Sequence, residues 1–406
     1  MRRRCTLAAA VLGLAMVAGG ALAGEGGEKL FNIGSRVPVT FYGYVKLDAA
    51  WDDSRTSVGN FARWAESEAT NRNDEEFNMT AKQTRLGLKL GGEDVGGMKP
   101  SGRVEIDFYG TDNNGENKPG VMLRHAYAKL DWAEYDFSVI AGQTSDVVSP
   151  LVLPTINYTA GWWQGNIGYR RPQLRLTKGF AIETDLLTRI ELAGALTRNI
   201  GHAGPFDPGD SGEDSGLPGL QWRVATTWKL LTERPTVLGV FGSCHQEEYD
   251  ITADNTDEDV DSDMIGLDLT LPLLDWLDLK AEWFRGRNLD TFLGGVGQGV
   301  TVDATTGRGR EITSEGGWLS LTLRDLPVDF LQKFTFNAGV GIDDPDDEDV
   351  SDGARTRNFN YFVNTWYNVG GGVSIGLEFM RLETQYEGEN DDGEAGRVQF
   401  SVVYKF

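Results

Sequence analysis

The chain has 406 residues, of which 61 are acidic and 38 basic, and its formal net charge at neutral pH is −23. Such an acidic surface repels the phosphate backbone of nucleic acid, and no basic tract offsets the repulsion, so nucleic acid is excluded as a partner. The 52 glycines and 13 prolines, with strand-like segments at regular spacing, favour one all-β barrel over a two-domain enzyme of the same length.

Residues 1–23 have the pattern of a secretory signal peptide. Arg2, Arg3 and Arg4 precede a short apolar run that ends in Ala21-Leu22-Ala23, and we expect cleavage after Ala23. The alternative, a membrane anchor, needs about 20 apolar residues, and this run is shorter. Cleavage would leave 35 of the 38 basic residues against 61 acidic ones, with Cys244 as the only cysteine, which excludes a disulfide within the chain. Residues 24–38 are then a short, glycine-rich lead-in to a barrel domain at 39–406.

From residue 39 onward, segments of about ten residues alternate apolar and polar side chains. In the first segment Val45, Leu47 and Ala49 oppose Lys46 and Asp48. The next two place Leu86, Leu88, Leu90, Val104, Ile106 and Phe108 opposite Gln83, Arg85, Lys89, Arg103, Glu105 and Asp107. This two-residue period, with apolar side chains outward and polar ones inward, is typical of a transmembrane antiparallel β-barrel, whereas a soluble sandwich would bury the same apolar faces.

The connectors between about sixteen candidate strands distinguish these two folds. Short turns near 131–134, 231–235, 271–276 and 370–371 alternate with long loops at 53–75, 111–119, 144–171, 198–218, 250–262, 287–312, 343–355 and 387–394. Outer-membrane barrels alternate in this way, with tight periplasmic turns and long extracellular loops. Acidic runs at 207–216, 254–263, 343–352 and 387–394 fall in long loops and are interpreted as solvated; divalent ions that bridge them to lipopolysaccharide are an alternative, although none has EF-hand spacing.

The connector Thr144–Arg171 has no charged residue between Asp146 and Arg170. Pro150, Pro154 and three glycines argue against a strand, and so apolar a connector should be covered by other parts of the protein. We predict that it is an inward-folded third extracellular loop that narrows the lumen. Its Tyr158, Trp162 and Trp163 either contact the apolar part of a solute or anchor the loop by packing, and Asp146 is its only carboxylate.

Aromatic residues near strand ends suggest girdles at the two membrane interfaces. They are Trp51, Trp132, Tyr135, Trp276, Trp366, Tyr367 and Tyr404. The last segment, GRVQFSVVYKF, has one apolar face that ends in Phe406. It resembles the C-terminal strand by which the barrel-assembly machinery recognises outer-membrane proteins.

Six motifs between about residues 40 and 180 resemble the DcaP-like trimeric porins of bacterial outer membranes. They are GYVKLDA at 43–49, KQTRLGLKL at 82–90, VEIDFYG at 104–110, LRHAYAKL at 123–130, AGQT at 141–144 and RRPQLRLT at 170–177. The resemblance implies a sixteen-stranded barrel in the outer membrane of a Gram-negative bacterium, a homotrimer, an inward third loop and passage of small anionic solutes such as dicarboxylates. The second half of the chain shares only general porin character, and the mature N-terminus is too short for the helical extension that some members carry.

The residues predicted to carry selectivity are polar side chains on the inward faces of strands beside the third loop. They are Gln83, Arg85, Arg103, Glu105, Asp107, Arg124, Arg171 and Arg175. Guanidinium groups stay charged at any working pH and bind carboxylates through a planar fork, so a ring of them favours anions. The alternative is that Glu105 and Asp107 pair with the arginines across strands and stiffen the wall. By parity, His125 and Tyr127 should face outward, where an imidazole suggests a covering subunit.

Together these features predict an outer-membrane porin, a passive channel for small hydrophilic solutes that favours anions. The alternatives are a phosphate-type anion porin, which would need a denser lysine row, and a non-conducting surface or adhesin barrel. The expected partners are small anions, outer-membrane lipid and lipopolysaccharide. We expect no cofactor, no metal and no enzymatic activity, because the sequence has no H-E-x-x-H or phosphate-loop motif and its G-x-S-x-G match at 372–376 has no histidine near it in the sequence.

Overall fold

The computed structural model describes residues 37–71, 74–110, 115–199, 212–251, 256–303, 307–388 and 392–406. The expected signal peptide, most of the lead-in and parts of the acidic loops lie outside these ranges. None of the helices in the described ranges has the length and apolarity needed to cross a membrane.

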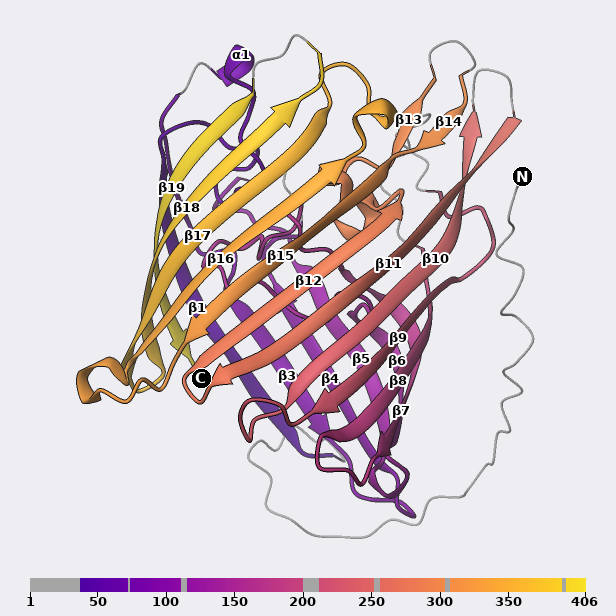
Figure 1. Ribbon diagram of the computed structural model, residues 1–406, viewed down its shortest axis with the longest axis vertical. Coiled ribbons are helices and arrows are strands. Elements are labelled where there is room, and N and C mark those ends of the chain that lie inside the picture. The colour runs from indigo at the N-terminus through magenta and orange to yellow at the C-terminus, as the bar shows by residue number, and fades with distance from the viewer. Residues whose placement is uncertain are drawn as a thin grey trace.

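The barrel is closed by sixteen antiparallel strand positions (Figure 1). The second position is shared by two shorter strands, β2 and β3, which both pair with β1. The strands are β1 (Val39–Asp52), β2 (Glu76–Thr80), β3 (Arg85–Gly91), β4 (Lys99–Asp107), β5 (Met122–Trp132), β6 (Phe137–Ser145), β7 (Arg170–Ala181), β8 (Leu187–Thr197), β9 (Gly219–Trp228), β10 (Thr236–Ile251), β11 (Thr256–Leu274), β12 (Leu277–Arg287), β15 (Thr313–Leu323), β16 (Phe334–Pro345), β17 (Arg355–Gly370), β18 (Val373–Tyr386) and β19 (Gly393–Lys405). β19 pairs back onto β1 from Tyr44↔Lys405 to Asp52↔Arg397, and this closure satisfies the backbone groups as a membrane-spanning sheet requires.

The remaining described elements are short and lie in the connectors. They are helix α1 (Glu68–Asn71), the hairpin of β13 (Val300–Val302) and β14 (Gly309–Glu311), and the 3₁₀ turns η1 (Ala133–Tyr135), η2 (Asp290–Phe292), η3 (Gly295–Gly297), η4 (Asp329–Leu331) and η5 (Asp347–Asp349).

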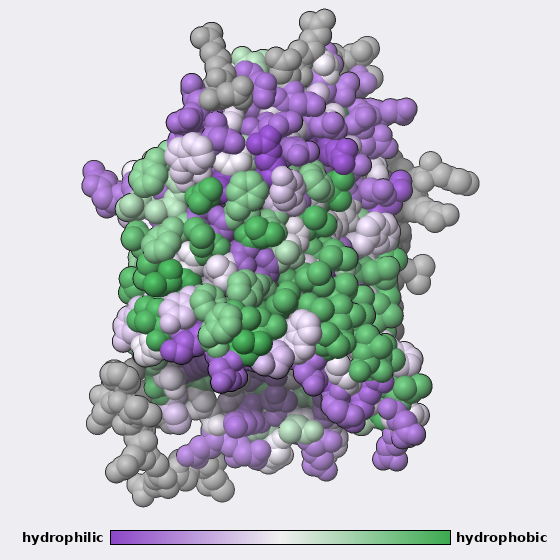
Figure 2. All heavy atoms as spheres, turned by 60° about the vertical axis from the view of Figure 1, so that its left-hand side comes forward, coloured by the Kyte–Doolittle hydropathy of each residue, from purple (hydrophilic) through white to green (hydrophobic). Residues whose placement is uncertain are grey.

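The strand faces have the polarity expected of a membrane barrel. Val45 and Leu47 on β1 are 53% and 40% exposed on the outside, whereas Lys46 and Asp48, which alternate with them, are each 4% exposed on the inside. Exposed large apolar side chains of this kind come from strands all round the barrel. Figure 2 shows them as an apolar belt between two polar ends. The prediction of an apolar exterior and a polar interior is therefore confirmed.

The connectors divide between the two ends of the barrel as predicted. The tight turns lie at the end that carries the C-terminus, and the longer connectors, with α1 and the β13–β14 hairpin, lie at the other end (Figure 1). The prediction of a long loop at 250–262 is wrong, because β10 and β11 extend through most of this range and pair, for example, at Glu247↔Val260. Inward Tyr249 and Val260 are buried there, so packing supports the longer ladder.

A β-bulge at Arg124 corrects the predicted orientation of two side chains. Glu105 of β4 pairs with His125 but Ile106 pairs with Leu123, so Arg124 is an extra residue on β5. Arg124 and His125 are both buried inside the barrel, and the His125 ring Nδ1 lies 3.0 Å from Thr144 Oγ1. Tyr127, two residues on, packs edge-on against His125. The prediction that His125 and Tyr127 face outward is wrong, because it assumed strict alternation along the strand, and the inserted residue interrupts that alternation.

The aromatic residues near strand ends divide into two groups. Trp51, Tyr135 and Tyr404 are exposed on the outside, as girdle residues are. Trp366 pairs with Gly376 on the lumen-facing side of β17, where it alternates with outward Tyr367. Trp366 is therefore not part of a girdle.

Candidate functional site: the narrowed lumen

The third long connector folds into the barrel, as predicted. Thr144 and Ser145 end β6, and Arg170 and Arg171 begin β7. The loop proper is therefore 146–169, which we call the constriction loop. Its Val147, Val148, Leu153 and Ile156 are buried, and it contacts strands on opposite sides of the barrel, from β4 and β5 to β12 and β18.

Buried carboxylates on the β12–β18 side hold the constriction loop by its backbone. The Glu282 carboxylate accepts hydrogen bonds from the Leu151 backbone N–H at 2.8 Å and from the Ser149 hydroxyl at 2.5 Å. The Glu378 carboxylate accepts from the backbone N–H groups of Ile156 at 2.6 Å and Asn157 at 2.9 Å. Carboxylate acceptors form stronger hydrogen bonds than neutral ones, so these contacts fix the loop at two places.

A second segment, residues 288–299 between β12 and β13, also folds into the lumen. The sequence predicted only an outer loop at 287–312, so this inward fold was missed. Leu289, Phe292 and Val296 are each no more than 1% exposed, and Leu289 and Phe292 join a cluster with Val148 and Ile167 of the constriction loop. The Asp343 carboxylate accepts a hydrogen bond from the Val296 backbone N–H at 3.1 Å. We refer to Glu282, Asp343 and Glu378 as the anchor carboxylates.

The opposite side of the lumen carries the predicted arginines. Arg85, Arg103 and Arg124, from three adjacent strands, converge on the carboxylate of Glu105. Arg124 Nε lies 3.0 Å from Glu105 Oε1, and its Nη1 lies 2.7 Å from Asp107 Oδ2. The side chains of Arg103 and Arg85 are 31% and 21% exposed, whereas that of Glu105 is 1% exposed. The cations therefore face the lumen more openly than the carboxylate that they share.

Tyr158 connects the constriction loop to these arginines. Its hydroxyl lies 3.2 Å from Asp107 Oδ2 and 3.4 Å from Arg124 Nη1, and its ring stacks on Tyr109 at 3.9 Å between centroids. Burial, and next the negative charge of Asp107, raise the pKa of the Tyr158 hydroxyl. The hydroxyl is therefore neutral at any working pH and donates its proton to Asp107.

Arg170 is a further lumen cation that the sequence prediction did not include. It is 4% exposed, and its guanidinium lies over the rings of Tyr169 at 4.9 Å and Trp162 at 5.5 Å. No carboxylate of the described residues forms an ion pair with it. Its position at the junction between an uncharged loop and a strand is the one sequence signal that could have identified it. We refer to Arg85, Arg103, Arg124 and Arg170, with Glu105 and Asp107, as the arginine wall.

Two predicted arginines lie apart from this wall. Arg171 is fully buried, and its Nε lies 2.8 Å from Asp146 Oδ1, while its guanidinium packs over the Phe292 ring at 4.0 Å. Arg175 donates to Gln173 Oε1 at 2.8 Å and to the Ser145 carbonyl. Both groups therefore hold the base of the constriction loop.

The other predicted residues fall on the two sides of the loop. Gln83 accepts a hydrogen bond from Lys46 below the loop. Trp163 lies toward the outer mouth, where the Arg63 guanidinium is 5.3 Å from its ring. The Trp163 carbonyl accepts from Asn358 at 2.6 Å, and Trp162 packs edge-on against Trp163. These two tryptophans thus contribute to packing within the constriction loop.

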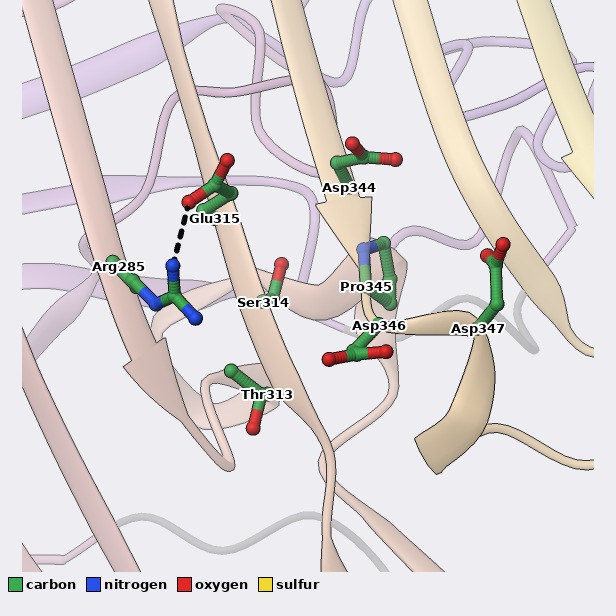
Figure 3. A pocket seen from close by; sticks show the side chains of 8 residues that line it. All are labelled: Arg285, Thr313, Ser314, Glu315, Asp344, Pro345, Asp346 and Asp347. Atoms are coloured by element: carbon green, nitrogen blue, oxygen red, sulfur yellow. Dashed lines mark hydrogen bonds and ion pairs between the residues drawn. The ribbon is translucent and has the colours of Figure 1, made fainter.

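A cavity of about 300 Å³ near the extracellular end does not belong to the lumen site. Figure 3 shows Arg285 paired with Glu315, with Asp344, Asp346 and Asp347 around Pro345. Arg285, Glu315 and Asp344 are exposed on the strand faces opposite those of the anchor carboxylates. Within the described ranges no three His, Cys, Asp or Glu side chains are placed to hold a metal ion.

The closed barrel, the apolar belt and the loop folded into the lumen define a transmembrane β-barrel of the porin fold. The chain matches no known family model and no curated protein. Among solved structures it is similar to the outer membrane channel DcaP of Acinetobacter baumannii, with 19% identity, 91% of this chain and 97% of that chain covered, and a TM-score of 0.69. It is also similar to the anion-selective porin from Comamonas acidovorans (13% identity, coverage of 91% and 100%, TM-score 0.57) and to the trimer form of OmpT of Vibrio cholerae (8%, 92% and 100%, 0.52).

These similarities confirm the fold that the resemblance to DcaP-like porins implied. A closed barrel with a lipid-facing apolar belt belongs in a bilayer, and single-chain barrels of this kind are proteins of bacterial outer membranes. The protein is therefore placed in the outer membrane of a Gram-negative bacterium.

Proposed function

We propose that this protein is a DcaP-like porin, a passive channel for small hydrophilic solutes that favours anions. The observation that carries the proposal is the charge of the arginine wall, where four guanidinium groups accompany two carboxylates beside the constriction loop. The excess of positive charge lies where the constriction loop meets the wall, at the contacts of Tyr158 with Asp107 and Arg124. A low-dielectric wall concentrates such a field, so anions are enriched in the passage.

The acidic outer loops do not cancel this field. Ions screen exposed charges over about 8 Å at physiological ionic strength, so the loops act on a solute at the mouth and not at the constriction. Other lumen carboxylates, such as Asp52 and Asp146, are buried in ion pairs with Arg397 and Arg171. The charge of these two carboxylates is thus neutralised by their arginine partners.

Small dicarboxylates are the solutes that fit this wall best within the proposed class. Arg85 and Arg103 are partly exposed, and each offers a planar fork to a carboxylate. The structurally similar porin from Comamonas acidovorans is anion-selective, which supports the same direction of selectivity.

The test is the reversal potential of the purified protein in a planar bilayer under a KCl gradient. We expect the wild type to pass chloride in preference to potassium, and Arg85→Gln with Arg103→Gln to lower that preference by about tenfold, since each lost unit charge at roughly 7 Å in water changes the ratio about threefold. Arg285→Gln, on the outer face, is the matched control and should change nothing. A cation-selective wild type, or a double variant with an unchanged reversal potential, would contradict the proposal.

We also propose the assembly and partners that the resemblance implies. A homotrimer is supported by the trimer form of the Vibrio cholerae neighbour, and light scattering of the detergent-solubilised protein tests it. The exposed apolar face that ends in Phe406 is proposed to be recognised by the barrel-assembly machinery. Outer-membrane lipid would cover the belt, and lipopolysaccharide the charged rim above it.

Two other functions make different predictions. A non-conducting surface barrel is favoured by the two segments folded into the lumen, and single-channel recording distinguishes it, because only a porin gives discrete conductance steps. A phosphate-type porin would show chloride current that phosphate blocks more strongly than succinate does. An enzymatic role is not part of the proposal. The G-x-S-x-G match at 372–376 runs into β18 and does not form the strand-to-helix turn that presents a nucleophilic serine, and no H-E-x-x-H motif occurs in the sequence.

A further inference from the structure

A cavity of about 450 Å³ lies directly below the constriction loop, toward the end of the barrel with the tight turns. Thr155 of the loop lines it from above, and Lys46, which also lines it, donates to the Ile156 carbonyl at 3.1 Å. Lys333, just before β16, and Ser374, at the start of β18, line it from below. We call this cavity the vestibule.

The vestibule is cationic. Its lining includes the side chains of Lys46, Lys333 and Lys405 and no acidic side chain. Lys46 is 4% exposed, and its Nζ forms an ion pair with Asp48 Oδ1 at 3.1 Å. Lys333 and Lys405 are exposed and form no ion pair with the described residues. Two ammonium groups are thus available to an anion from the lumen.

One wall of the vestibule is aromatic, because Trp366 faces the lumen. The position across from it on β18 is Gly376. A Cβ there would lie 2.8 Å from Trp366 Cζ3 and 2.7 Å from Ile156 Cδ1, so only glycine leaves room for the indole against the loop. Tyr44 and Val403 add further apolar surface to the lining, while Thr155, Thr335 and Ser374 add hydroxyl groups.

We propose that the vestibule binds a small aromatic carboxylate, a solute of the size and charge of benzoate. The carboxylate would pair with Lys333 and Lys405, and the ring would pack against Trp366. The volume is within the range of small-molecule sites. This inference rests on the proposed anion channel and extends it by naming a solute class and a site on the periplasmic side of the constriction. The site adjoins the arginine wall, since the Arg85 guanidinium lies over the ring of Tyr44 at 5.2 Å.

The test uses benzoate as the probe and acetate, benzyl alcohol and benzylamine as the comparison compounds. Binding to the detergent-solubilised protein is measured by calorimetry, and block of chloride current is measured with benzoate on either side of the bilayer. We expect benzoate to bind at least about tenfold more tightly than each comparison compound, since each lacks either the ring, the charge or its sign. Block should be stronger from the side with the tight turns.

Two variants assign the binding to the vestibule. Lys333→Gln and Trp366→Leu should each weaken benzoate binding by about tenfold, while the controls Lys229→Gln, on a turn at the same end, and Tyr367→Leu, on the outer face of the same strand, should not. Equal binding of benzoate and acetate, or unchanged binding in both vestibule variants, would overturn the inference.

The outcomes for the channel and the vestibule can be separated. Arg103→Gln should alter the reversal potential and leave benzoate binding unchanged, because Arg103 contacts Tyr42 and Glu105, neither of which lines the vestibule. A cation-selective or non-conducting protein that still binds benzoate through Lys333 and Trp366 would end the anion-channel proposal and preserve the vestibule site. An anion-selective channel that does not bind benzoate would support the anion-channel proposal and overturn the vestibule site.

Discussion

The two sides of the lumen use carboxylates in opposite ways. In the arginine wall, Glu105 and Asp107 pair with guanidinium groups side chain to side chain, and Arg85 and Arg103 stay partly exposed. On the facing side, the anchor carboxylates form no ion pair within the described ranges and accept hydrogen bonds from backbone N–H groups of the inward segments. The first side presents charge to the passage, and the second fixes the width of the passage.

This difference shows why a count of charges does not predict selectivity. The chain carries a large negative charge, yet Glu105 and Asp107 in its lumen are buried and paired with guanidinium groups. A charge that lies against an opposite charge adds little to the field in the passage, because the two fields largely cancel. Substitutions of the anchor carboxylates should therefore change the conductance, and substitutions in the arginine wall should change the ion selectivity.

The largest effect is expected from Glu378→Ala. The substitution leaves the buried N–H groups of Ile156 and Asn157 without their acceptor, and each such loss costs about 1–3 kcal/mol. The constriction loop should then detach from β18, and single-channel conductance should rise and become noisy. Glu383→Ala, an exposed outward position on the same strand, is the control. A conductance equal to that of the wild type would mean that Glu378 does not hold the loop.

A smaller effect of a different kind is expected from Glu105→Gln. Removing this carboxylate leaves Arg85, Arg103 and Arg124 without their shared counter-charge, so the preference for anions should increase about threefold, the effect of one unit charge at roughly 7 Å in water. The reversal potential measures it, with Glu315→Gln on the outer face as control. If the arginines serve only to stiffen the wall, the ratio will stay constant while thermal stability falls.

The smallest effect is expected from Tyr158→Phe. The variant loses the hydroxyl contacts to Asp107 and Arg124, at 3.2 and 3.4 Å, but keeps the ring that stacks on Tyr109. We expect a loss of stability of about 0.5–1.5 kcal/mol, seen as a lower midpoint of thermal unfolding, with the reversal potential unchanged. A change in selectivity as large as that of Glu105→Gln would show that the hydroxyl acts directly on ions.

Much of the barrel could be predicted from the sequence, because a lipid-facing wall imposes a two-residue period that survives in each strand. Val45, Leu47, Lys46 and Asp48 face as predicted, and the uncharged Thr144–Arg171 segment identified the constriction loop. The inward side of Arg85, Arg103 and Arg124 followed from the same rule. Their convergence on Glu105 depends on strand register, which the period alone does not fix.

Three features could not be predicted by that rule. The bulge at Arg124 reverses the parity of His125 and Tyr127, because one inserted residue shifts every later side chain to the other face. The room that Gly376 on the adjacent strand leaves for the inward Trp366 depends on the register between β17 and β18. The second inward segment, 288–299, is nearly uncharged, like the constriction loop, and Asp290 is its only charged residue. The other charged residues of the 287–312 loop obscured this feature when the loop was considered as a whole.

The anchoring of the constriction loop by its main chain has a consequence for how this protein can change. Glu282 and Glu378 bind amide protons that every residue except proline possesses. Side chains on the lumen face of the loop can therefore be exchanged while its path across the barrel is kept. A scaffold of this kind can acquire new solute preferences through single substitutions, without first rebuilding the pore.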